Sequence, residues 1–311
     1  MSISIVGASV IIDYILPVEK LPTPGEVVRI IKINGLGKPY WGGCAPNIAA
    51  SLARLGIPSS LVYPVGDDFP ESDCENYWRS LGIDLSNLCL QPGRPSGVAY
   101  LFFQPGAETM CFSALGASAE AQPQVNTCLE ELVVLTPVVG DFTSHYLDRS
   151  LSERHRVAVS GVVSPQIVDS LNGIQLFIHN SREASALCRL AHIPDISHLA
   201  HRYPNCLFYV TCGDKGSMVF QDRTQIAIPA IQPGRYVDPT GAGDAYAAGV
   251  IMAWLKGYDP ETAGYIGATC ASFVLEAFGA QTNLPSMQEV VKRLSVQTPE
   301  IGRRIHEKDL A

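Results

Sequence analysis

Residues 238–244, which read DPTGAGD, form the segment of the chain best suited to chemistry. Gly241 and Gly243 allow a tight turn that exposes successive backbone N–H groups, and the small apolar residues that follow are typical of a buried helix. Such a turn binds anions, because the unpaired amides and the helix dipole both favour negative charge. Asp244 lies in the same turn, where its carboxylate can take a proton from a hydroxyl while the amides hold a phosphoryl group.

A purely structural interpretation of this segment stays open, in which the glycines only start a helix and Asp244 caps it. A P-loop is excluded, because no Gly-Lys-Ser/Thr follows the glycines. A nicotinamide-dependent dehydrogenase would need Gly-x-Gly-x-x-Gly after the first strand. Residues 7–10, GASV, do not supply that motif.

The elements around this segment alternate between strands and helices. The β-branched residues 2–9 are typical of a buried strand, and the helical run 47–55 is followed by Gly56, a common helix stop. Further strand-like runs, with helical stretches between the later ones, occupy residues 61–65, 133–139, 157–163, 176–178 and 207–211. This alternation predicts an α/β fold in which helices flank both faces of a mostly parallel central sheet.

Two segments break the alternation. Proline and glycine punctuate residues 14–40, and residues 97–114 show the alternation of a β-hairpin around a Gln-Pro-Gly-Ala turn. We expect these segments to form a small β lid over a site. The predicted division assigns residues 14–40 and 95–118 to the lid, and residues 1–13, 41–94 and 119–311 to the α/β core.

The bulk composition limits the class of protein. The chain has 311 residues, of which 47% are hydrophobic, and a net charge of −8 without a basic stripe, so we expect no nucleic-acid partner. The N-terminus lacks the charged start of a secretory signal, and no uninterrupted apolar run reaches transmembrane length. The nine cysteines form no Cys-x-x-Cys pair. We therefore expect a cytoplasmic protein without a membrane partner.

The motifs, taken in order along the chain, resemble those of the ribokinase-like (PfkB) family of carbohydrate and nucleoside kinases. Residues 41–56, WGGCAPNIAASLARLG, resemble the first signature of that family, and residues 238–244 resemble its C-terminal signature. Between these two lie, in the family's order, VGDD at 65–68, LGID at 81–84, NSRE at 180–183 and VTCGDKG at 210–216. The resemblance covers nearly the whole chain.

The resemblance implies roles for the nucleotide side of a site. Asp244 would be the base, and Gly241, Ala242 and Gly243 would form the anion hole for the transferred phosphoryl group. Residues that match the family's ATP site are Asn180, Glu183, Thr211 and Gly213, with Glu183 helping to place Mg²⁺ through water. Asp238 and Thr240, with the loop at 277–283, match the place where relatives bind a monovalent cation such as K⁺. ATP, Mg²⁺ and K⁺ are therefore the implied cofactors.

The resemblance also implies an acceptor site. Asp13 falls where the family holds two sugar hydroxyls with an aspartate, and an ionised carboxylate can accept two O–H donors side by side. Gly43 and Asn47 fall at neighbouring substrate contacts. The alternatives are a polar strand end for Asp13 and a helix cap for Asn47.

The substrate expected from the resemblance is a small molecule, a nucleoside or a sugar. Residues 42–47 and 274–285 look like microbial adenosine and nucleoside kinases, which favours phosphorylation of a primary hydroxyl on an adenosine-like nucleoside. Tyr100, Phe102 and Phe112 of the lid are candidates to stack on the base, and the alternation does not show which side of the hairpin faces inward. A ribose- or fructose-type sugar kinase and a non-catalytic nucleotide- or sugar-binding sensor remain alternatives. A homodimer through the lid is a further expectation.

Overall fold

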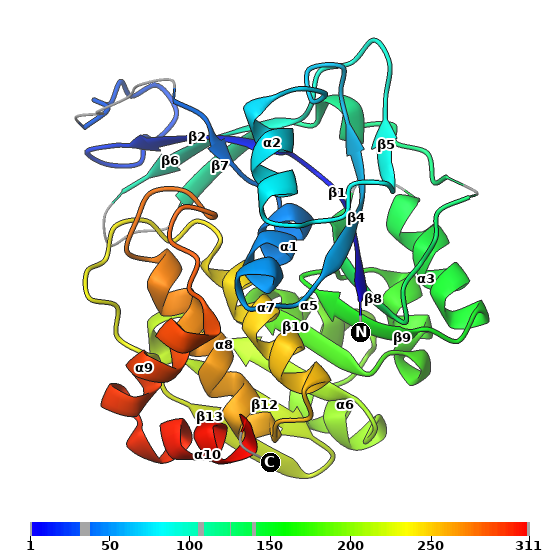
Figure 1. Cartoon of the computed structure of the whole chain (residues 1–311), viewed down its shortest axis with the longest axis vertical. Coiled ribbons are helices and arrows are strands. Elements are labelled where there is room, and N and C mark those ends of the chain that lie inside the picture. Colours follow the sequence, from blue (N-terminus) through cyan, green and yellow to red (C-terminus); the bar gives the residue numbers. More distant parts are fainter. Residues whose placement is uncertain (1, 32–37, 105–108, 125, 139–140, 310–311) are drawn as a thin grey trace.

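The structure is a computed structural model that describes residues 2–31, 38–104, 109–124, 126–138 and 141–309 (Figure 1). It has a central nine-stranded sheet and a separate four-stranded sheet. Of the helices in these residues, none is both long and apolar enough to span a bilayer.

The central sheet has the strand order β13-β12-β11-β10-β9-β8-β1-β4-β5. Neighbouring strands are parallel from β5 to β11, and β12 and β13 each pair antiparallel with the preceding strand. The strands are β1 (Ile3–Ala8), β4 (Ser59–Val65), β5 (Leu88–Leu90), β8 (Leu132–Val138), β9 (Arg156–Ser160), β10 (Leu176–Asn180), β11 (Leu207–Thr211), β12 (Ser217–Gln221) and β13 (Thr224–Ile228). The predicted α/β fold with a mostly parallel sheet is confirmed.

Helices cover both faces of this sheet, because each face carries its own hydrophobic core. One core is built by α1 (Cys44–Arg54), α2 (Asp73–Ser80), α7 (Ala242–Leu255), α8 (Pro260–Val274), α9 (Met287–Gln297) and α10 (Pro299–Asp309). The other core is built by α3 (Phe142–Ser152), α4 (Pro165–Asp169), α5 (Ser181–Leu190) and α6 (Ile196–Arg202). Three short 3₁₀ helices are η1 (Gly116–Ser118), η2 (Leu171–Gly173) and η3 (Gly213–Lys215).

The predicted element bounds differ from the structure mainly at strand and helix ends. The helix expected over 47–55 starts earlier, at Cys44, because Gly43 with φ 90° turns the chain into the helix and Pro46 fits its first turn. The strand expected over 157–163 ends at Ser160, where Gly161 with φ 73° breaks the ladder.

The small sheet has the order β3-β2-β6-β7, with β2 (Ile12–Pro17), β3 (Tyr40–Trp41), β6 (Val98–Phe103) and β7 (Thr109–Ala114). It lies beyond the ends of α1 and α7 in Figure 1. The expected hairpin is confirmed, since β6 and β7 pair antiparallel; part of its turn, residues 105–108, lies outside the described residues. Its four strands fall within or next to the two segments assigned to the lid, and we keep that division as a proposal.

Candidate active site

The predicted anion-binding turn has a left-handed backbone at the start of α7. Gly241, the N-cap, has φ 79°, and a Cβ there would lie 2.3 Å from Ala280 Cβ, so only glycine fits. A Cβ at Gly243 would meet no atom within 4 Å. The turn is therefore closed on the side of Ala280 and open above Gly243, where an anion has room. The Ala242 amide already donates to the Pro239 carbonyl at 3.2 Å.

Asp244 lies in the first turn of α7, and it contacts α1, which comes almost two hundred residues earlier. The side-chain amide of Asn47 donates from Nδ2 to Asp244 Oδ2 at 2.8 Å. The Cys44 thiol also hydrogen-bonds this carboxylate. Burial raises the pKa of the Cys44 thiol well above its usual range, so the thiol stays protonated and acts as a donor.

Burial raises the pKa of Asp244 to about 6, against the hydrogen bonds from Asn47 and Cys44, which lower it. The charge of Glu183, at the start of α5, adds to the rise. A carboxylate with a pKa near neutrality is ionised at pH 7 and still basic enough to accept a proton. The site thus contains a group suited to general base catalysis.

Asp13 lies on β2 and is only 4% exposed. Burial, followed by the charges of Asp244 and Asp238, raises the pKa of Asp13 to about 7. The backbone at Gly42 passes so close that a Cβ there would lie 2.0 Å from Asp13 Oδ2. The structure therefore brings Asp13 and Asp244 together. The position of the Asp13 side chain also requires glycine at position 42, which the sequence alone did not indicate.

Gly43 is the N-cap of α1 and packs against the backbone of the loop after β1. Its φ is 90°, and a Cβ there would lie 2.2 Å from the Val10 carbonyl oxygen and 2.9 Å from the Tyr63 hydroxyl. Gly43 therefore brings the backbone of α1 close to the site, which is consistent with its predicted place beside the substrate.

Asp238 ties the 277–283 loop to the anion-binding turn. It is fully buried; Oδ1 accepts from the Thr240 amide at 3.0 Å and hydroxyl at 2.7 Å, and Oδ2 accepts from the Gly279 amide at 2.9 Å. Within the described part of the chain, the ion pairs do not include this carboxylate. Asp238 is therefore a buried carboxylate whose partners in these contacts are hydrogen-bond donors.

Asn180 and Glu183 form a capping box at the start of α5. Asn180 Oδ1 accepts from the amides of Arg182 and Glu183 at 2.9 Å, and Glu183 Oε2 accepts from the Asn180 amide at 2.8 Å. Thr211 ends the neighbouring strand β11, and Gly213, with φ 62°, starts η3. The four predicted ATP residues therefore lie at the carboxyl ends of adjacent parallel strands, where ligands of α/β folds bind.

The structure corrects the expectation for the lid aromatics. Residues that pair across a sheet share a face; Tyr14 pairs with Tyr100 and Tyr100 with Phe112, whereas buried Asp13 pairs with Ala99. Tyr100, Phe112 and also Phe102, two residues along the strand, therefore lie on the face opposite to Asp13. Tyr100 and Phe112 are 44% and 56% exposed on that face.

The face of the lid that Asp13 shares carries smaller or aliphatic side chains, apart from Phe103. Its members, read from the same pairing, are Ile15, Leu101, Phe103, Cys111 and Ser113. The register of the lid strands, which the alternation alone did not give, decides which side faces inward.

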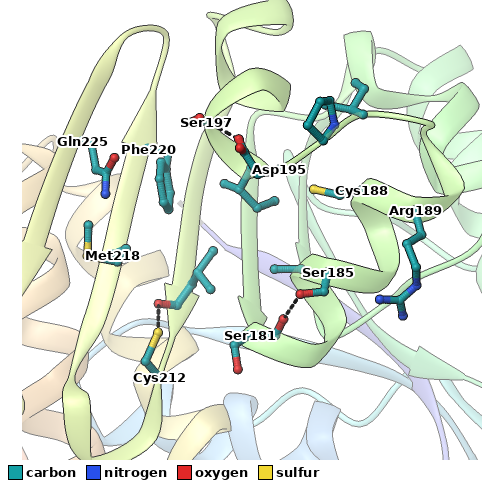
Figure 2. Close-up of a pocket in the computed structure, with 15 residues that line it drawn as sticks. Ser181, Ser185, Cys188, Arg189, Asp195, Ser197, Cys212, Met218, Phe220 and Gln225 are labelled. Atoms are coloured by element: carbon teal, nitrogen blue, oxygen red, sulfur yellow. Dashed lines mark hydrogen bonds between the residues drawn. The ribbon is translucent and has the colours of Figure 1, made fainter.

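A cavity of about 570 Å³ lies on the other side of the central sheet, between α5, the start of α6 and the strands β11 and β12 (Figure 2). Cys188, Met218 and Phe220 are among the residues that line it. Ser181 and Cys212 bring its rim next to the predicted ATP residues, but none of the predicted site residues lines it. Among the described residues, no cluster of three His, Cys, Asp or Glu side chains could hold a metal ion by itself.

The fold and site together define a ribokinase-like small-molecule kinase: a mostly parallel sheet with helices on both faces, a β lid, and two buried carboxylates beside a glycine turn. Comparison with known proteins agrees with this class. The model of the pfkB family of carbohydrate kinases matches residues 2–287. The chain belongs to this family and is an ATP-dependent phosphotransferase with an alcohol group as acceptor.

Within the family, the chain is similar to archaeal nucleoside kinases. The nucleoside kinase of Methanocaldococcus jannaschii is 34% identical over 295 residues, which cover 91% of this chain and 93% of that protein. Its crystal structure superimposes with a TM-score of 0.81 over 95% of this chain and 98% of that chain, at 32% identity. The structure of Burkholderia thailandensis nucleoside kinase in complex with inosine shares the fold, with a TM-score of 0.82 over 95% of this chain and 98% of that chain, at 20% identity.

Proposed function

We propose that this kinase transfers the γ-phosphoryl group of ATP to a primary hydroxyl of a nucleoside, with Asp244 as the general base. The observation that carries the proposal is the position of Asp244, a half-buried carboxylate with a pKa of about 6 beside the glycine turn at 241–243. The similarity to nucleoside kinases of Methanocaldococcus jannaschii and Methanothermobacter thermautotrophicus, at 34% and 29% identity, supports the substrate class.

The proposed step is an in-line displacement. The acceptor oxygen forms a bond to the γ-phosphorus, the bond from that phosphorus to the β,γ-bridging oxygen breaks, and ADP leaves. Asp244 takes the proton of the hydroxyl, which makes the oxygen a better nucleophile. The amides of Gly241, Ala242 and Gly243 stabilise the charge on the transferring group, because they are fixed in position before the reaction.

The acceptor is held by Asp13, Asn47 and the backbone at Gly43. Asp13 accepts hydrogen bonds from two adjacent hydroxyls, such as those of a ribose. Asn47 Nδ2 has two N–H groups, and the one that does not donate to Asp244 can donate to the acceptor. Leu101 and Cys111 of the inward lid face supply an apolar surface for the base in place of the outward aromatic rings.

ATP is proposed to bind along Asn180, Glu183, Thr211 and Gly213. Magnesium neutralises phosphate charge when it is bound, and Glu183 would hold it through water, since Mg²⁺ keeps several waters in such sites. Asp238, Thr240 and the 277–283 loop would hold K⁺ and order the anion-binding turn. Activity that is the same in K⁺ and in a bulky organic cation, at matched ionic strength, would contradict the K⁺ site.

The outward face of the lid is proposed as the contact in a homodimer. It carries Tyr14 stacked on Tyr100, with ring centroids 5.3 Å apart, and Phe102 edge-to-face with Phe112 at 5.8 Å. Exposed aromatic clusters of this kind are typical of protein interfaces. Replacement of Phe112 by Ser should shift the mass measured by light scattering from dimer to monomer.

The test of the substrate class compares kcat/KM for adenosine, inosine and cytidine with kcat/KM for ribose, fructose and fructose phosphates, at saturating Mg-ATP. We expect a nucleoside to be used more efficiently than any free sugar. A sugar or sugar phosphate with a kcat/KM tenfold above that of every nucleoside would favour the sugar-kinase alternative. The 26% identity to a Bacillus subtilis ribokinase is the observation that supports this alternative. ATP binding without turnover of any acceptor would favour the sensor alternative.

A further inference from the structure

Four side chains, from three helices and one loop, form a continuous hydrogen-bonded network that ends on Asp244. Trp78 of α2 donates from Nε1 to Gln281 Oε1 at 3.1 Å, and Gln281 donates from Nε2 to Asn47 Oδ1 at 2.9 Å. Asn47 then donates from Nδ2 to Asp244 Oδ2 at 2.8 Å. Trp78, Gln281 and Asn47 are 0%, 6% and 5% exposed, so water does not compete with these bonds.

The two ends of this network fix the direction of every bond in it. The indole N–H of Trp78 can only donate, and the ionised carboxylate of Asp244 can only accept. Gln281 must therefore turn its oxygen to Trp78 and its nitrogen to Asn47. Asn47 in turn presents its oxygen to Gln281 and its nitrogen to Asp244. A flip of the Gln281 amide would set donor against donor at Trp78 and acceptor against acceptor at Asn47.

Gln281 is itself held in place by contacts outside this network. The Tyr77 hydroxyl, next to Trp78 on α2, donates to the Gln281 carbonyl at 3.1 Å. Two residues earlier in the same loop, the Gly279 amide donates to Asp238 at 2.9 Å. The backbone of the loop is thus fixed independently of the Gln281 side chain.

We propose that Gln281, oriented by Trp78, is a positioning residue for the general base: it holds the Asn47 amide so that its nitrogen always donates to Asp244. Without Gln281, Asn47 is free to turn its oxygen toward the carboxylate, which would place two acceptors face to face. This inference rests on the proposed role of Asp244 in phosphoryl transfer.

The hydrogen-bonded network from Trp78 to Asn47 acts on Asp244 alongside several other groups. The Cys44 thiol of α1 also hydrogen-bonds the carboxylate, and the Glu183 carboxylate of α5 faces it with like charge. The Asp13 carboxylate of β2 lies close enough for its charge to interact with the Asp244 carboxylate. These groups stay unchanged in variants at positions 78 and 281. A shift in the pKa of Asp244 in those variants is therefore due to the lost hydrogen bonds of the network.

The experiment compares Gln281→Met, Trp78→Phe and Tyr77→Phe. Gln281→Met removes the donor and the acceptor of position 281 with little change in volume. Trp78→Phe removes the indole N–H and also leaves a cavity, which its Tm reports. Tyr77→Phe is the matched control, because it removes a hydrogen bond to the backbone of Gln281 only. The first readout is the titration of the Asp244 carboxyl by carbon NMR, which needs no turnover. The second is the pH profile of kcat, with the KM for ATP and the Tm of each variant.

We expect Gln281→Met to raise the pKa of Asp244 by about one unit, as the loss of a charge-assisted hydrogen bond implies. The smaller ionised fraction should lower kcat about twofold at pH 7 and about tenfold at pH 5. Trp78→Phe should shift both in the same direction by a smaller amount, and Tyr77→Phe should shift neither. In an Asn47→Ala background, Gln281→Met should cause no further change in the Asp244 pKa. The KM for ATP should stay constant throughout.

Equal titration of Asp244 in wild type, Gln281→Met and Trp78→Phe would overturn the proposal, as would an equal shift in Tyr77→Phe. A lower Tm without a shift in pKa would also overturn it, because it would show a structural role only. Should the NMR shift occur in a protein that phosphorylates no acceptor, the positioning inference would stand and the proposed function would fail.

Discussion

The proposed acceptor side and the proposed nucleotide side of the site are built in different ways. On the acceptor side, Asp13 and Asn47 are buried, and Asn47 and Asp244 are held by residues from distant parts of the sequence. On the nucleotide side, Asn180 and Glu183 cap their own helix, and Asn180 and Gly213 are exposed. The comparison indicates that the fold preorganises the proposed acceptor side, whereas the residues proposed for the nucleotide side are held mainly by contacts within their own helix.

Removal of the base should have the largest effect. Asp244→Asn should lower kcat by about a hundred- to ten-thousandfold and leave ATP affinity nearly unchanged, because the loss falls on proton transfer. Steady-state kinetics and calorimetric titration with ATP measure the two quantities. A variant with near-wild-type kcat would show that Asp244 is not the base.

Asp13→Ala should weaken acceptor binding without affecting ATP. Loss of a charge-assisted partner costs about 1.5–3 kcal/mol, so KM for the acceptor should rise roughly ten- to a hundredfold. Asp13→Asn provides a control that keeps the size of the side chain and removes its charge. Equal rises in both KM values would indicate that Asp13 supports the fold and not the substrate.

The two raised pKa values predict opposite pH trends for activity and stability. In the proposed mechanism Asp13 and Asp244, with pKa values of about 7 and about 6, are both ionised during turnover, so kcat/KM should fall as the pH drops below about 7. Because both pKa values lie above the ordinary 3.8, the folded state binds these protons more tightly than the unfolded state. Their contribution to stability is therefore present at low pH and is lost as the pH rises from about 4 to 7.

The Asp13→Asn variant separates the contribution of Asp13 to the pH dependence of stability from that of the other titrating groups. It should raise the Tm of the ligand-free protein at pH 7.5 and flatten its dependence on pH, as followed by differential scanning calorimetry. A lower Tm for Asp13→Asn at that pH would contradict the assignment of a destabilising buried charge.

The smallest effect is expected from the capping box on the nucleotide side. Asn180→Ala removes an N-cap and should cost about 0.5–2 kcal/mol of stability, seen as a lower Tm. Glu183→Gln keeps an acceptor for the Asn180 amide and removes the charge, so it should preserve Tm and raise the KM for Mg-ATP. An unchanged KM for Mg-ATP in Glu183→Gln would show that Asn180 and Glu183 have a structural role only.

The sequence predicted those parts of the site that depend on local chain properties. The glycines at 241 and 243, the helix after them and the alternation of strands and helices all follow from residue types over short spans. The fold class was predictable for the same reason, because burial on both faces of a parallel sheet leaves a repeated apolar pattern.

The parts that the sequence did not predict depend on long-range contacts. Asn47 is 197 residues from Asp244, and Trp78 is 203 residues from Gln281, so no local pattern shows that these side chains meet. The lid is a similar case. Alternation predicted its strands, but only the pairing of Asp13 with Ala99 shows which face is inward.

The most direct test of the proposed activity identifies the product. Wild-type protein, Mg-ATP and adenosine are incubated, and the mixture is analysed by phosphorus NMR and mass spectrometry. We predict a nucleoside monophosphate with the phosphoryl group on the primary hydroxyl, formed in equal amount to ADP. ADP accompanied only by inorganic phosphate, or a phosphoryl group on a secondary hydroxyl, would contradict the proposal.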